Sequence, residues 1–361
     1  MNCILLDVKP FVDDLQNQSK IEILESSHLV RVSIVIPSFN SGGTLRRCLS
    51  SIMALDYPKK DLEVLIVDGG SSDETVRVAE GFPVRVLIEP KRIRGATYNR
   101  GLKEATGEYV GYIDADGGVY KSWLKEGLNL ISADRSVAAV YFRSEVPEDA
   151  TDFQAAAGIF QTKGKLLVQH APALQGSGAN GAIYRREALE VIRGFNEEIT
   201  YGQEDELTAR LQKAGYKVET GGRNLVFHYP RASVWGFFAQ AVEQGIGFVR
   251  RYPILRQRRM VAYMVVRSMA AVLPLLVLIV LSRSLLAAVL LVVTIGILAM
   301  TYYANLYARL GPERRKARLV VISLPLVYIS CIASLIGYTI GLAGFAWRKR
   351  RLWKTNRISI V

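Results

Sequence analysis

Short apolar runs alternate with polar loops and amphipathic stretches over the first 250 residues of the chain. The apolar runs predict buried strands, because each is short, rich in β-branched residues and bounded by glycine, proline or aspartate. The segments between them predict helices, as at residues 95–105, where Tyr98 and Leu102 are spaced by four. Strand, loop and helix in this order predict an α/β fold with a mostly parallel sheet. The expected strands are residues 32–36, 64–67, 84–88, 109–113 and 137–142.

Polar side chains follow three of these strands at the point where each strand ends. They are Asn40 after the first, Asp68 and Asp73 after the second, and Asp114 and Asp116 after the fourth. Asparagine and aspartate are common turn residues, so each alone is explained by turn chemistry. Ligands of such sheets bind beyond the carboxyl ends of the strands, so three polar loops on one edge indicate a binding crevice.

Two carboxylates leave one strand end together, because Asp114 and Asp116 are separated by a single small residue. Side chains at i and i+2 lie on the same side of an extended chain. Such a pair suits a hard divalent cation, Mg²⁺ or Mn²⁺, that carries phosphate oxygens. An aspartate-rich turn that only closes the strand is the alternative.

Three later features add candidate chemistry, each with a structural alternative. Glu204 and Asp205 open a predicted helix, where acidic residues also favour the helix dipole; Asp205 is a candidate general base. His228 follows a short expected strand at 224–227 and is either a structural residue or a third metal ligand. The glycine-rich residues 175–181 lead to Arg185 and Arg186, which suit a phosphate or a solvated basic turn.

The composition changes after residue 250, where long apolar runs stand beside clusters of arginine and lysine. Each run approaches the roughly 20 residues that cross a bilayer, so residues 262–304 predict a transmembrane hairpin. A third apolar segment, 319–347, predicts either a crossing or a re-entrant segment, and buried core helices are the alternative for the whole region. The net charge of +13 then favours an anionic membrane surface over nucleic acid, for which no motif is present.

The cysteines, the N-terminus and the changes in composition indicate how the chain is divided. Three dispersed cysteines give neither a disulfide framework nor a zinc spacing, and the acidic N-terminus does not resemble a secretory signal. The predicted division is an N-terminal extension (1–30), a catalytic domain (31–255), a membrane domain (260–347) and a basic tail (348–361).

Four motifs carry a family resemblance: Ser-Ile-Val-Ile-Pro-Ser-Phe-Asn at 33–40, Val-Asp-Gly-Gly-Ser-Ser-Asp-Glu-Thr at 67–75, Gly-Glu-Tyr-Val-Gly-Tyr-Ile-Asp-Ala-Asp at 107–116, and Glu-Asp at 204–205. In order and spacing the chain resembles family 2 glycosyltransferases. The resemblance implies a GT-A (nucleotide-diphospho-sugar transferase) fold, a Rossmann-like mixed-sheet domain followed by C-terminal transmembrane helices. The tail resembles membrane-anchored exopolysaccharide glycosyltransferases of the succinoglycan type.

The resemblance also implies roles for individual residues. Asp205 matches the catalytic base with Glu204 beside it, Asp116 matches a ligand of Mg²⁺ or Mn²⁺, and His228 is the candidate additional ligand. Gly69 and Gly70 depart from the family pattern, and the Gln-x-x-Arg-Trp motif of processive synthases is missing, which favours transfer of one sugar per encounter. The expected nucleotide-sugar-binding residues are Pro37, Phe39, Asn40, Asp68, Gly95, Asn99 and Asp114.

The expected activity is inverting transfer from a nucleotide-diphosphate-sugar to a hydroxyl acceptor, on a lipid-linked glycan in polysaccharide or glycoprotein assembly. A lipid phosphate acceptor needs no base, so Glu204 and Asp205 favour a hydroxyl. The expected location is the cell (inner or plasma) membrane, as a multi-pass protein with a cytoplasmic catalytic domain. The alternatives are a polyprenyl-phosphate sugar synthase and a non-catalytic nucleotide-binding scaffold; a nucleotidyltransferase is disfavoured because residues 38–44 lack a basic side chain.

Overall fold

The computed structural model describes residues 30–158, 180–199, 202–222 and 225–255, then residues 269, 319, 322, 325, 326 and 329–344. Nearly all of the N-terminal extension and the predicted hairpin at 262–304, and the whole basic tail, lie outside these residues.

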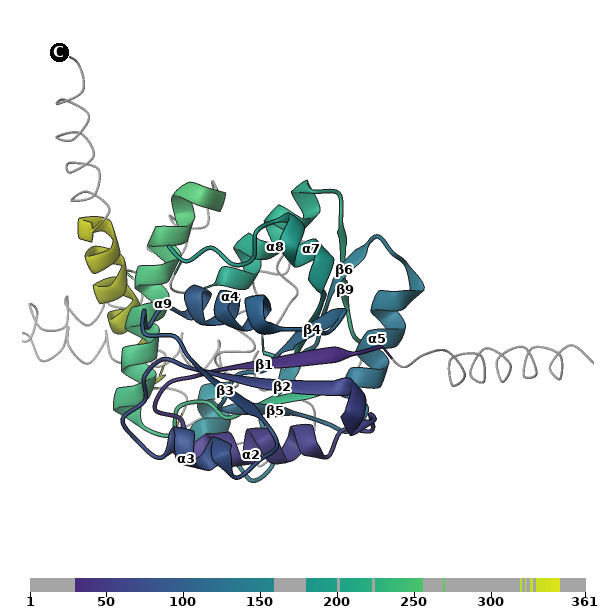
Figure 1. The fold of residues 1–361 in the computed structure, drawn as a ribbon. Helices are drawn as coiled ribbons and strands as arrows, with labels where there is room; N and C mark the ends of the chain where they lie inside the picture. Colours follow the sequence, from purple (N-terminus) through teal and green to yellow (C-terminus); the bar gives the residue numbers. More distant parts are fainter. Residues whose placement is uncertain are drawn as a thin grey trace, which may run out of the picture.

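A seven-stranded mixed sheet forms the centre of the protein, in the order β3-β2-β1-β4-β8-β6-β9 (Figure 1). Strands β3, β2, β1 and β4 run parallel to one another, and β8 runs antiparallel to both β4 and β6. The predicted α/β architecture is therefore confirmed, with β8 as the strand that makes the sheet mixed. The strands are β1 (Val32–Ser38), β2 (Leu62–Asp68), β3 (Arg85–Ile88), β4 (Tyr109–Tyr112), β6 (Val137–Tyr141), β8 (Ala182–Arg185) and β9 (Lys217–Thr220).

Helices cover both faces of the sheet, and strand alternation divides the core between them (Figure 1). Ile34 and Ile36 of β1 pack on the side of α2 and α5, whereas Val35 packs on the side of α4 and α8. A buried strand with apolar residues on both faces is what a helix-covered parallel sheet requires. The helices are α2 (Gly42–Met53), the 3-10 helix η1 (Lys59–Asp61), α3 (Thr75–Glu80), α4 (Arg94–Glu104), α5 (Trp123–Ala133), α7 (Arg186–Val191) and α8 (Gln203–Lys213).

A second sheet, of three short strands, lies beyond the end of β4. Its order is β5 (Gly117–Val119), β10 (Val226–His228) and β7 (Ser144–Glu145). The antiparallel pairing of β10 with β5 places His228 opposite Gly117. The expected strand at 224–227 is displaced accordingly: His228 is the last residue of the strand rather than the residue after it.

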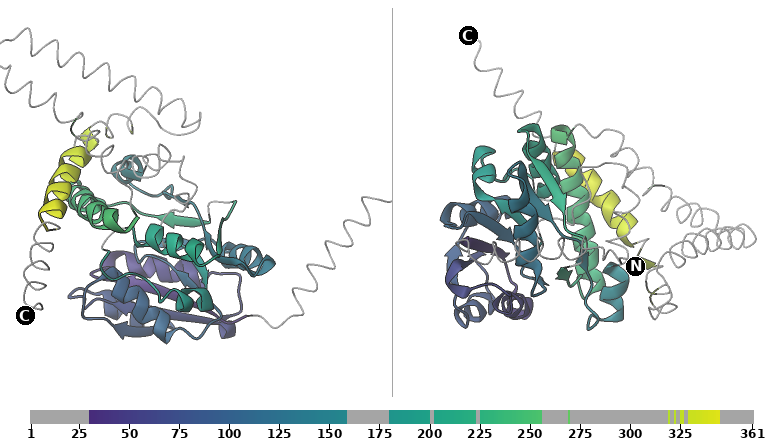
Figure 2. Two further views of the ribbon diagram at one scale, coloured as in Figure 1. Left: turned by 90° about the horizontal axis from the view of Figure 1, so that it is seen from above. Right: turned by 90° about the vertical axis from the view of Figure 1, so that its right-hand side faces the viewer.

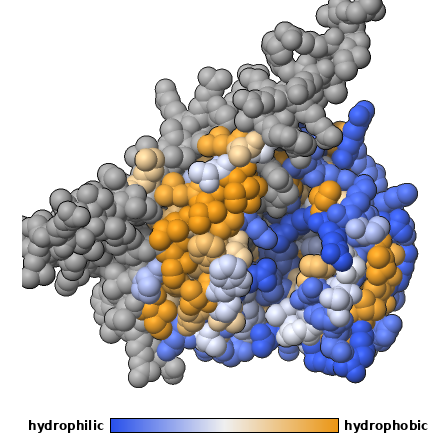
Figure 3. Space-filling model, turned by 90° about the vertical axis from the view of Figure 1, so that its left-hand side faces the viewer, coloured by the Kyte–Doolittle hydropathy of each residue, from blue (hydrophilic) through white to orange (hydrophobic). Residues whose placement is uncertain are grey.

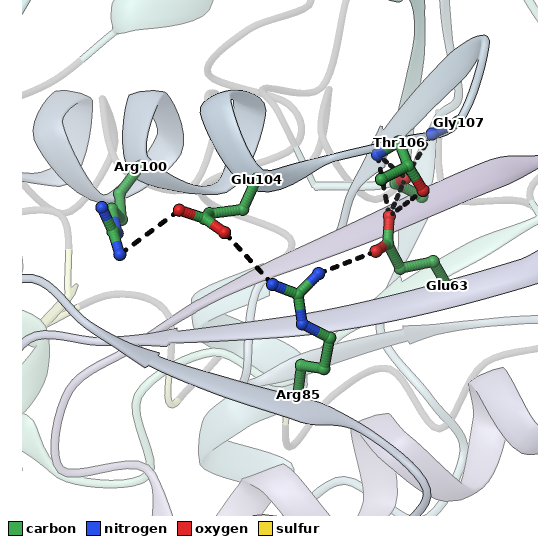
Figure 4. Close-up of polar contacts among 7 residues, drawn as sticks. Glu63, Arg85, Arg100, Glu104, Thr106 and Gly107 are labelled. Atoms are coloured by element: carbon green, nitrogen blue, oxygen red, sulfur yellow. Dashed lines mark hydrogen bonds and ion pairs between the residues drawn. The ribbon is translucent and has the colours of Figure 1, made fainter.

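A polar network joins four elements at the amino end of the large sheet (Figure 4). The Glu63 carboxylate accepts hydrogen bonds from Ser33 Oγ (2.5 Å) and from the backbone N–H of Thr106 (2.9 Å). Arg85 Nη1 lies 3.0 Å from Glu63, and Arg85 Nη2 lies 3.1 Å from Glu104. Burial alone raises the pKa of Glu63, but these hydrogen bonds outweigh it and hold the pKa below its ordinary value.

Glu63→Gln is therefore expected to lower the free energy of unfolding by about 1–3 kcal/mol at pH 7. A carboxylate whose pKa is depressed in the folded state stabilises the protein above its unfolded pKa of about 4.3. The stability advantage of the wild type should shrink as the pH falls through the lower folded pKa. Denaturant unfolding at pH 7 and in acid measures this; the exposed Glu80→Gln is the control, and an equal loss in both variants would contradict the network's role.

Two C-terminal helices pack closely through glycine. α9 (Val234–Leu255) follows β10, and the helix at residues 329–344 lies beside it (Figure 2). A Cβ built on Gly245 would lie 3.0 Å from Gly337 Cα, and one on Gly341 would lie 2.9 Å from Val249 Cβ. Such small residues let two helix backbones approach each other.

Within the described residues, no helix combines the length and the apolar character needed to span a bilayer. The expected hairpin lies outside that part of the chain apart from residue 269, and the third apolar segment is described only in part. The transmembrane helices therefore stay a prediction.

Candidate functional site

The Asp-Ala-Asp turn leaves the end of β4 and enters β5. The backbone carbonyl of Asp114 accepts a hydrogen bond from Gly117 N–H (2.9 Å), which closes the turn. The pairing of β5 with β10 then brings the side chain of His228 to Asp116, with Nε2 3.2 Å from Oδ1. Asp116 and His228, 112 positions apart by number, thus lie together, while the role of His228 as a metal ligand stays a prediction.

The two carboxylates of this turn have different electrostatic surroundings. Burial raises the pKa of Asp114 above its ordinary value, although the charge of Arg94 opposes that rise. Burial also acts to raise the pKa of Asp116, but His228 overcomes it and holds that pKa at about 2. Conversely, burial acts to lower the pKa of His228, and the partner Asp116 raises it. Asp116 and His228 therefore each favour the charged form of the other.

Arg94 and Tyr98 extend the cluster from α4. The Tyr98 hydroxyl, fully buried, lies 3.4 Å from Asp114 Oδ1. Burial first, then the negative charges of Asp114 and Glu204, raise the pKa of Tyr98 well above its ordinary value. Arg94 is the exposed first residue of α4, and Tyr98 and the carboxylates of Asp114 and Glu204 raise its pKa. The charges of Asp114 and Glu204 thus both act on this part of α4.

The first turn of α8 presents the predicted acidic pair. Gly202 precedes the helix in a left-handed conformation (φ +72°), which only glycine adopts without strain. Glu204 and Asp205 are half-buried, whereas the buried Glu206 is engaged by Arg210 (2.7 Å). Of the pair, Glu204 raises the pKa of both Arg94 and Tyr98 through its negative charge.

The loops after β1 and β2 are bonded to each other. The Asn40 side chain accepts a hydrogen bond from Ser72 N–H (2.9 Å), and the buried Asp68 accepts them from Gly70 N–H (2.9 Å) and Ser71 N–H (2.7 Å). Asn40 therefore joins the two loops, and Asp68 holds the loop after β2 in shape. The neighbouring Phe39 ring is 49% exposed, and the Arg92 guanidinium lies over it, 5.1 Å from the ring centroid. Pro37 is half-buried within β1.

Gly95 and Asn99 of α4 hold the segment that follows α7. The Asn99 amide donates to Phe195 O (2.9 Å), and its oxygen accepts from Phe195 N–H (2.8 Å). A Cβ on Gly95 would lie 2.9 Å from Asn196 O, so close packing against this segment requires glycine. The Asn99 amide also donates to the Glu197 carboxylate (3.2 Å), so the contacts of both residues are within the protein, and a role in ligand binding stays a prediction.

Arg185 and Arg186 lie at the opposite end of the sheet, so the phosphate interpretation is wrong for both. Arg185 is 6% exposed, pairs in register with Tyr109 at the start of β4, and donates to Ile131 O (2.8 Å). Arg186 donates to Gly107 O (2.7 Å). The solvated-turn alternative is also wrong for Arg185, because its guanidinium binds carbonyl oxygens inside the core.

The donor set fits a hard divalent cation that keeps positions open for other oxygens. Asp116 and His228 bring a carboxylate oxygen and an imidazole nitrogen together, with Asp114 two residues before. In the described part of the chain, no group of three or more His, Cys, Asp or Glu side chains converges to hold a metal ion, so the protein would supply only a few ligands. Mg²⁺ and Mn²⁺ sites that bind phosphates use few protein ligands, so this open arrangement suits them.

Comparison with known proteins connects this site to a family. The model of "Glycosyl transferase family 2" matches residues 33–193. Succinoglycan biosynthesis protein ExoA of Rhizobium meliloti (strain 1021) is 30% identical over 242 residues, which cover 63% of this chain and 71% of that protein. The chain belongs to glycosyltransferase family 2. As a member of this family, it is an enzyme that transfers a glycosyl group.

Other relatives of this glycosyltransferase match in part. Glycosyltransferase AglE of Haloferax volcanii is 33% identical over 113 residues, which cover 30% of this chain but 37% of that protein. A Methanococcus voltae protein is 25% identical over 229 residues, covering 59% of this chain and 71% of that protein. It is named dolichyl N-acetyl-alpha-D-glucosaminyl phosphate 3-beta-D-2,3-diacetamido-2,3-dideoxy-beta-D-glucuronosyltransferase.

A solved structure shares the fold of the glycosyltransferase. The mannosyltransferase PcManGT from Pyrobaculum calidifontis, in complex with GDP-Man and Mn²⁺, aligns with a TM-score of 0.58 and 20% identity. The alignment covers 92% of this chain and 96% of that chain. The expected GT-A-like mixed α/β fold is therefore confirmed.

Three residues of the site were not among the predicted ones: Arg94, Tyr98 and Asn180. Arg94 had a signal, because it stands beside Gly95 in a predicted loop-to-helix segment. Tyr98 was assigned only to a helix face. Asn180 lay in a glycine-rich segment, and nothing in the sequence indicates that its side chain would contact Asp114 (Asp114 N–H to Asn180 Oδ1, 3.1 Å).

Proposed function

We propose that this glycosyltransferase transfers a sugar, with inversion, from a nucleotide-diphosphate-sugar to a hydroxyl group of a lipid-linked glycan. One observation carries the proposal: the Asp116–His228 pair and Asp114 stand at the carboxyl end of β4, linked through Tyr98 and Arg94 to the acidic first turn of α8. This arrangement supports a cation site for the donor and a candidate base for the acceptor near the same end of β4.

Asp116 and His228 would hold Mg²⁺ or Mn²⁺, with Asp114 beside them. The bound cation would neutralise negative charge on the departing nucleoside diphosphate. The name of the related PcManGT, which includes both GDP-Man and Mn²⁺, supports this assignment. On the protein side, Phe39 offers an exposed ring to the nucleobase, and the loops with Asn40 and Asp68 line the nucleoside position.

Asp205 would accept the proton of the acceptor hydroxyl as it attacks the anomeric carbon. Asp205 is half-buried in the first turn of α8, where the helix dipole favours a negative charge, as a general base requires. Glu204, whose negative charge acts on Arg94 and Tyr98, would shape the charge around the donor.

Arg94 would contact the diphosphate, since it is an exposed cation beside Asp114. Arg94→Ala is expected to raise KM for the donor about 10- to 100-fold, as a charge-assisted hydrogen bond contributes about 1.5–3 kcal/mol. Arg100→Ala is the matched control, because Arg100 lies on the same helix and pairs with Glu104 (3.4 Å). Steady-state kinetics measure both variants. An unchanged donor KM in Arg94→Ala would show that Arg94 does not bind the donor.

A membrane location is supported by one apolar surface. Ile332, Ile336 and Ile340, spaced by four on the helix at 329–344, are 38%, 39% and 49% exposed. Figure 3 shows a continuous apolar area on the side of the molecule where this helix and α9 lie. Basic clusters at 250–259 and 348–354 stand beside apolar sequence, as in proteins at an anionic bilayer. We therefore place the enzyme at the cell membrane, multi-pass, with its catalytic domain cytoplasmic.

The acceptor class follows from the relatives and from the base. The Methanococcus voltae relative is named for a dolichyl phosphate-linked sugar, and ExoA for succinoglycan biosynthesis. A hydroxyl acceptor on such a lipid-linked glycan requires deprotonation, which Asp205 would supply. A lipid phosphate acceptor, as in a polyprenyl-phosphate sugar synthase, is already anionic and would not need Asp205 as a base.

Release of free nucleoside diphosphate tests the proposal. Detergent-purified protein with Mn²⁺ or Mg²⁺ is incubated with UDP- and GDP-sugars, and with either a lipid-linked glycan or polyprenyl phosphate. Metal-dependent release that requires the lipid-linked glycan is the expected result. Release only with polyprenyl phosphate would show that the acceptor is a lipid phosphate and not a hydroxyl group. Nucleotide binding without any release would favour a non-catalytic scaffold.

A further inference from the structure

Asn180 is a buried amide in direct contact with the Asp-Ala-Asp turn. It is 4% exposed, and its Oδ1 accepts the backbone N–H of Asp114 (3.1 Å). Its Nδ2 is buried and has no hydrogen-bond partner among the described residues. A buried N–H group without a partner costs about 1–3 kcal/mol, so its retention calls for a reason.

The backbone beside Asn180 is fixed on two sides. Gly181 N–H donates to Tyr112 O at the end of β4 (2.7 Å), and the indole N–H of Trp123 donates to Gly181 O (2.9 Å). Gly181 has φ +74°, and a Cβ built on it would lie 2.2 Å from Val226 of β10, the strand that carries His228. The segment is thus anchored to both strands that deliver the predicted metal ligands.

The Asn180 amide also lies against the turn itself. A Cβ built on Gly117 would stand 2.7 Å from Asn180 Nδ2 and 2.8 Å from Oδ1. Only a glycine at 117 leaves room for the amide there. Asn180 therefore contacts the beginning of the turn through Asp114 N–H and its end through Gly117, with Asp116 between them.

We propose that Asn180 is a positioning residue that sets the geometry in which Asp114 and Asp116 meet a divalent cation. The inference deepens the proposed function and rests on it. A neutral amide suits this place, because it accepts the Asp114 N–H without adding a third negative charge beside two aspartates. Groups that orient metal ligands commonly change metal affinity about 10- to 100-fold when they are removed.

The test is Mn²⁺ binding to the full-length protein in detergent, with and without nucleoside diphosphate, measured independently of turnover. Asn180→Ala is expected to weaken Mn²⁺ binding about 10- to 100-fold. In transfer assays, the Mn²⁺ concentration for half-maximal rate should rise by the same factor, while kcat at saturating Mn²⁺ stays close to the wild-type value. Mn²⁺ affinity within twofold of the wild type would overturn the proposal.

A matched control separates positioning from loss of stability. Ser33→Ala removes buried hydrogen bonds to Glu63 and Gly107 at the other end of the sheet. It should lower Tm and leave Mn²⁺ affinity unchanged. Equal losses of Mn²⁺ affinity in Asn180→Ala and Ser33→Ala, at equal Tm, would show a general structural effect and overturn the proposal.

Gly117→Ala provides a second route if Asn180→Ala does not fold. Its new methyl group should displace the Asn180 amide and weaken Mn²⁺ binding, although Phe227 O, 2.9 Å from the same Cβ position, must also yield. Combined with Asn180→Ala, it should add much less than its separate effect, because both changes break one contact. Full additivity would contradict the proposal. Failure of the wild type to bind Mn²⁺ would instead refute the proposed metal site.

Discussion

Asp205→Asn is expected to lower kcat by about 100- to 10,000-fold, which is the usual contribution of a general base. Asparagine keeps the size and the hydrogen-bonding reach of aspartate but cannot take a proton from the acceptor. The position at the first turn of α8 tolerates either residue, since the neighbouring Leu207 and Leu211 supply the buried face of the helix. Donor binding and Tm should therefore remain near their wild-type values.

The acidic first turn offers its own comparisons for that experiment. Glu206→Gln is the control, because Glu206 is engaged by Arg210 and belongs to the scaffold. It should retain transfer and lose some stability. Glu204→Gln decides between the two members of the pair: loss of transfer there, with full activity in Asp205→Asn, would assign the base to Glu204 instead. Single-turnover rates, donor affinity and Tm are the measurements.

Asp116→Asn is expected to reduce metal-dependent transfer to less than about one-hundredth of the wild-type rate, since a bound cation contributes several kcal/mol to such reactions. The substitution removes a carboxylate whose pKa His228 holds at about 2, despite the burial that opposes ionisation. It also deprives His228 of its charged partner at 3.2 Å. Mn²⁺ titration of nucleoside diphosphate binding should show the loss directly.

Asp134→Asn is the matched control for Asp116→Asn. Asp134 forms an ion pair with Lys217 (2.9 Å), and both of its partners lie outside the Asp-Ala-Asp turn. A surface pair of this kind contributes little, about 0–1 kcal/mol, so activity and Mn²⁺ binding should be unchanged. Wild-type metal dependence in Asp116→Asn would remove this carboxylate from the metal site and with it the central feature of the proposed function.

The sequence determined the order of the elements and the edge of the sheet where the site lies. The apolar runs that became β1, β2 and β4 are continuous because helices cover both faces, and a buried strand of this kind is legible from composition alone. Their polar ends, with Asn40, Asp68 and Asp114, follow the strands directly, so parallel pairing was enough to place them on one edge.

Only the tertiary structure decided which distant residues meet there. The antiparallel pairing of β10 with β5 brought His228 to Asp116, and the bond from Gly181 to Tyr112 placed Asn180 under the turn. Arg185 lies at the far end of the sheet, because β8 runs antiparallel to β4. Local pattern records the period and ends of a strand, whereas partner and direction depend on contacts between residues far apart in the chain. For that reason the carboxylates of the site could be predicted from the sequence, whereas the groups that surround them could be identified only from the fold.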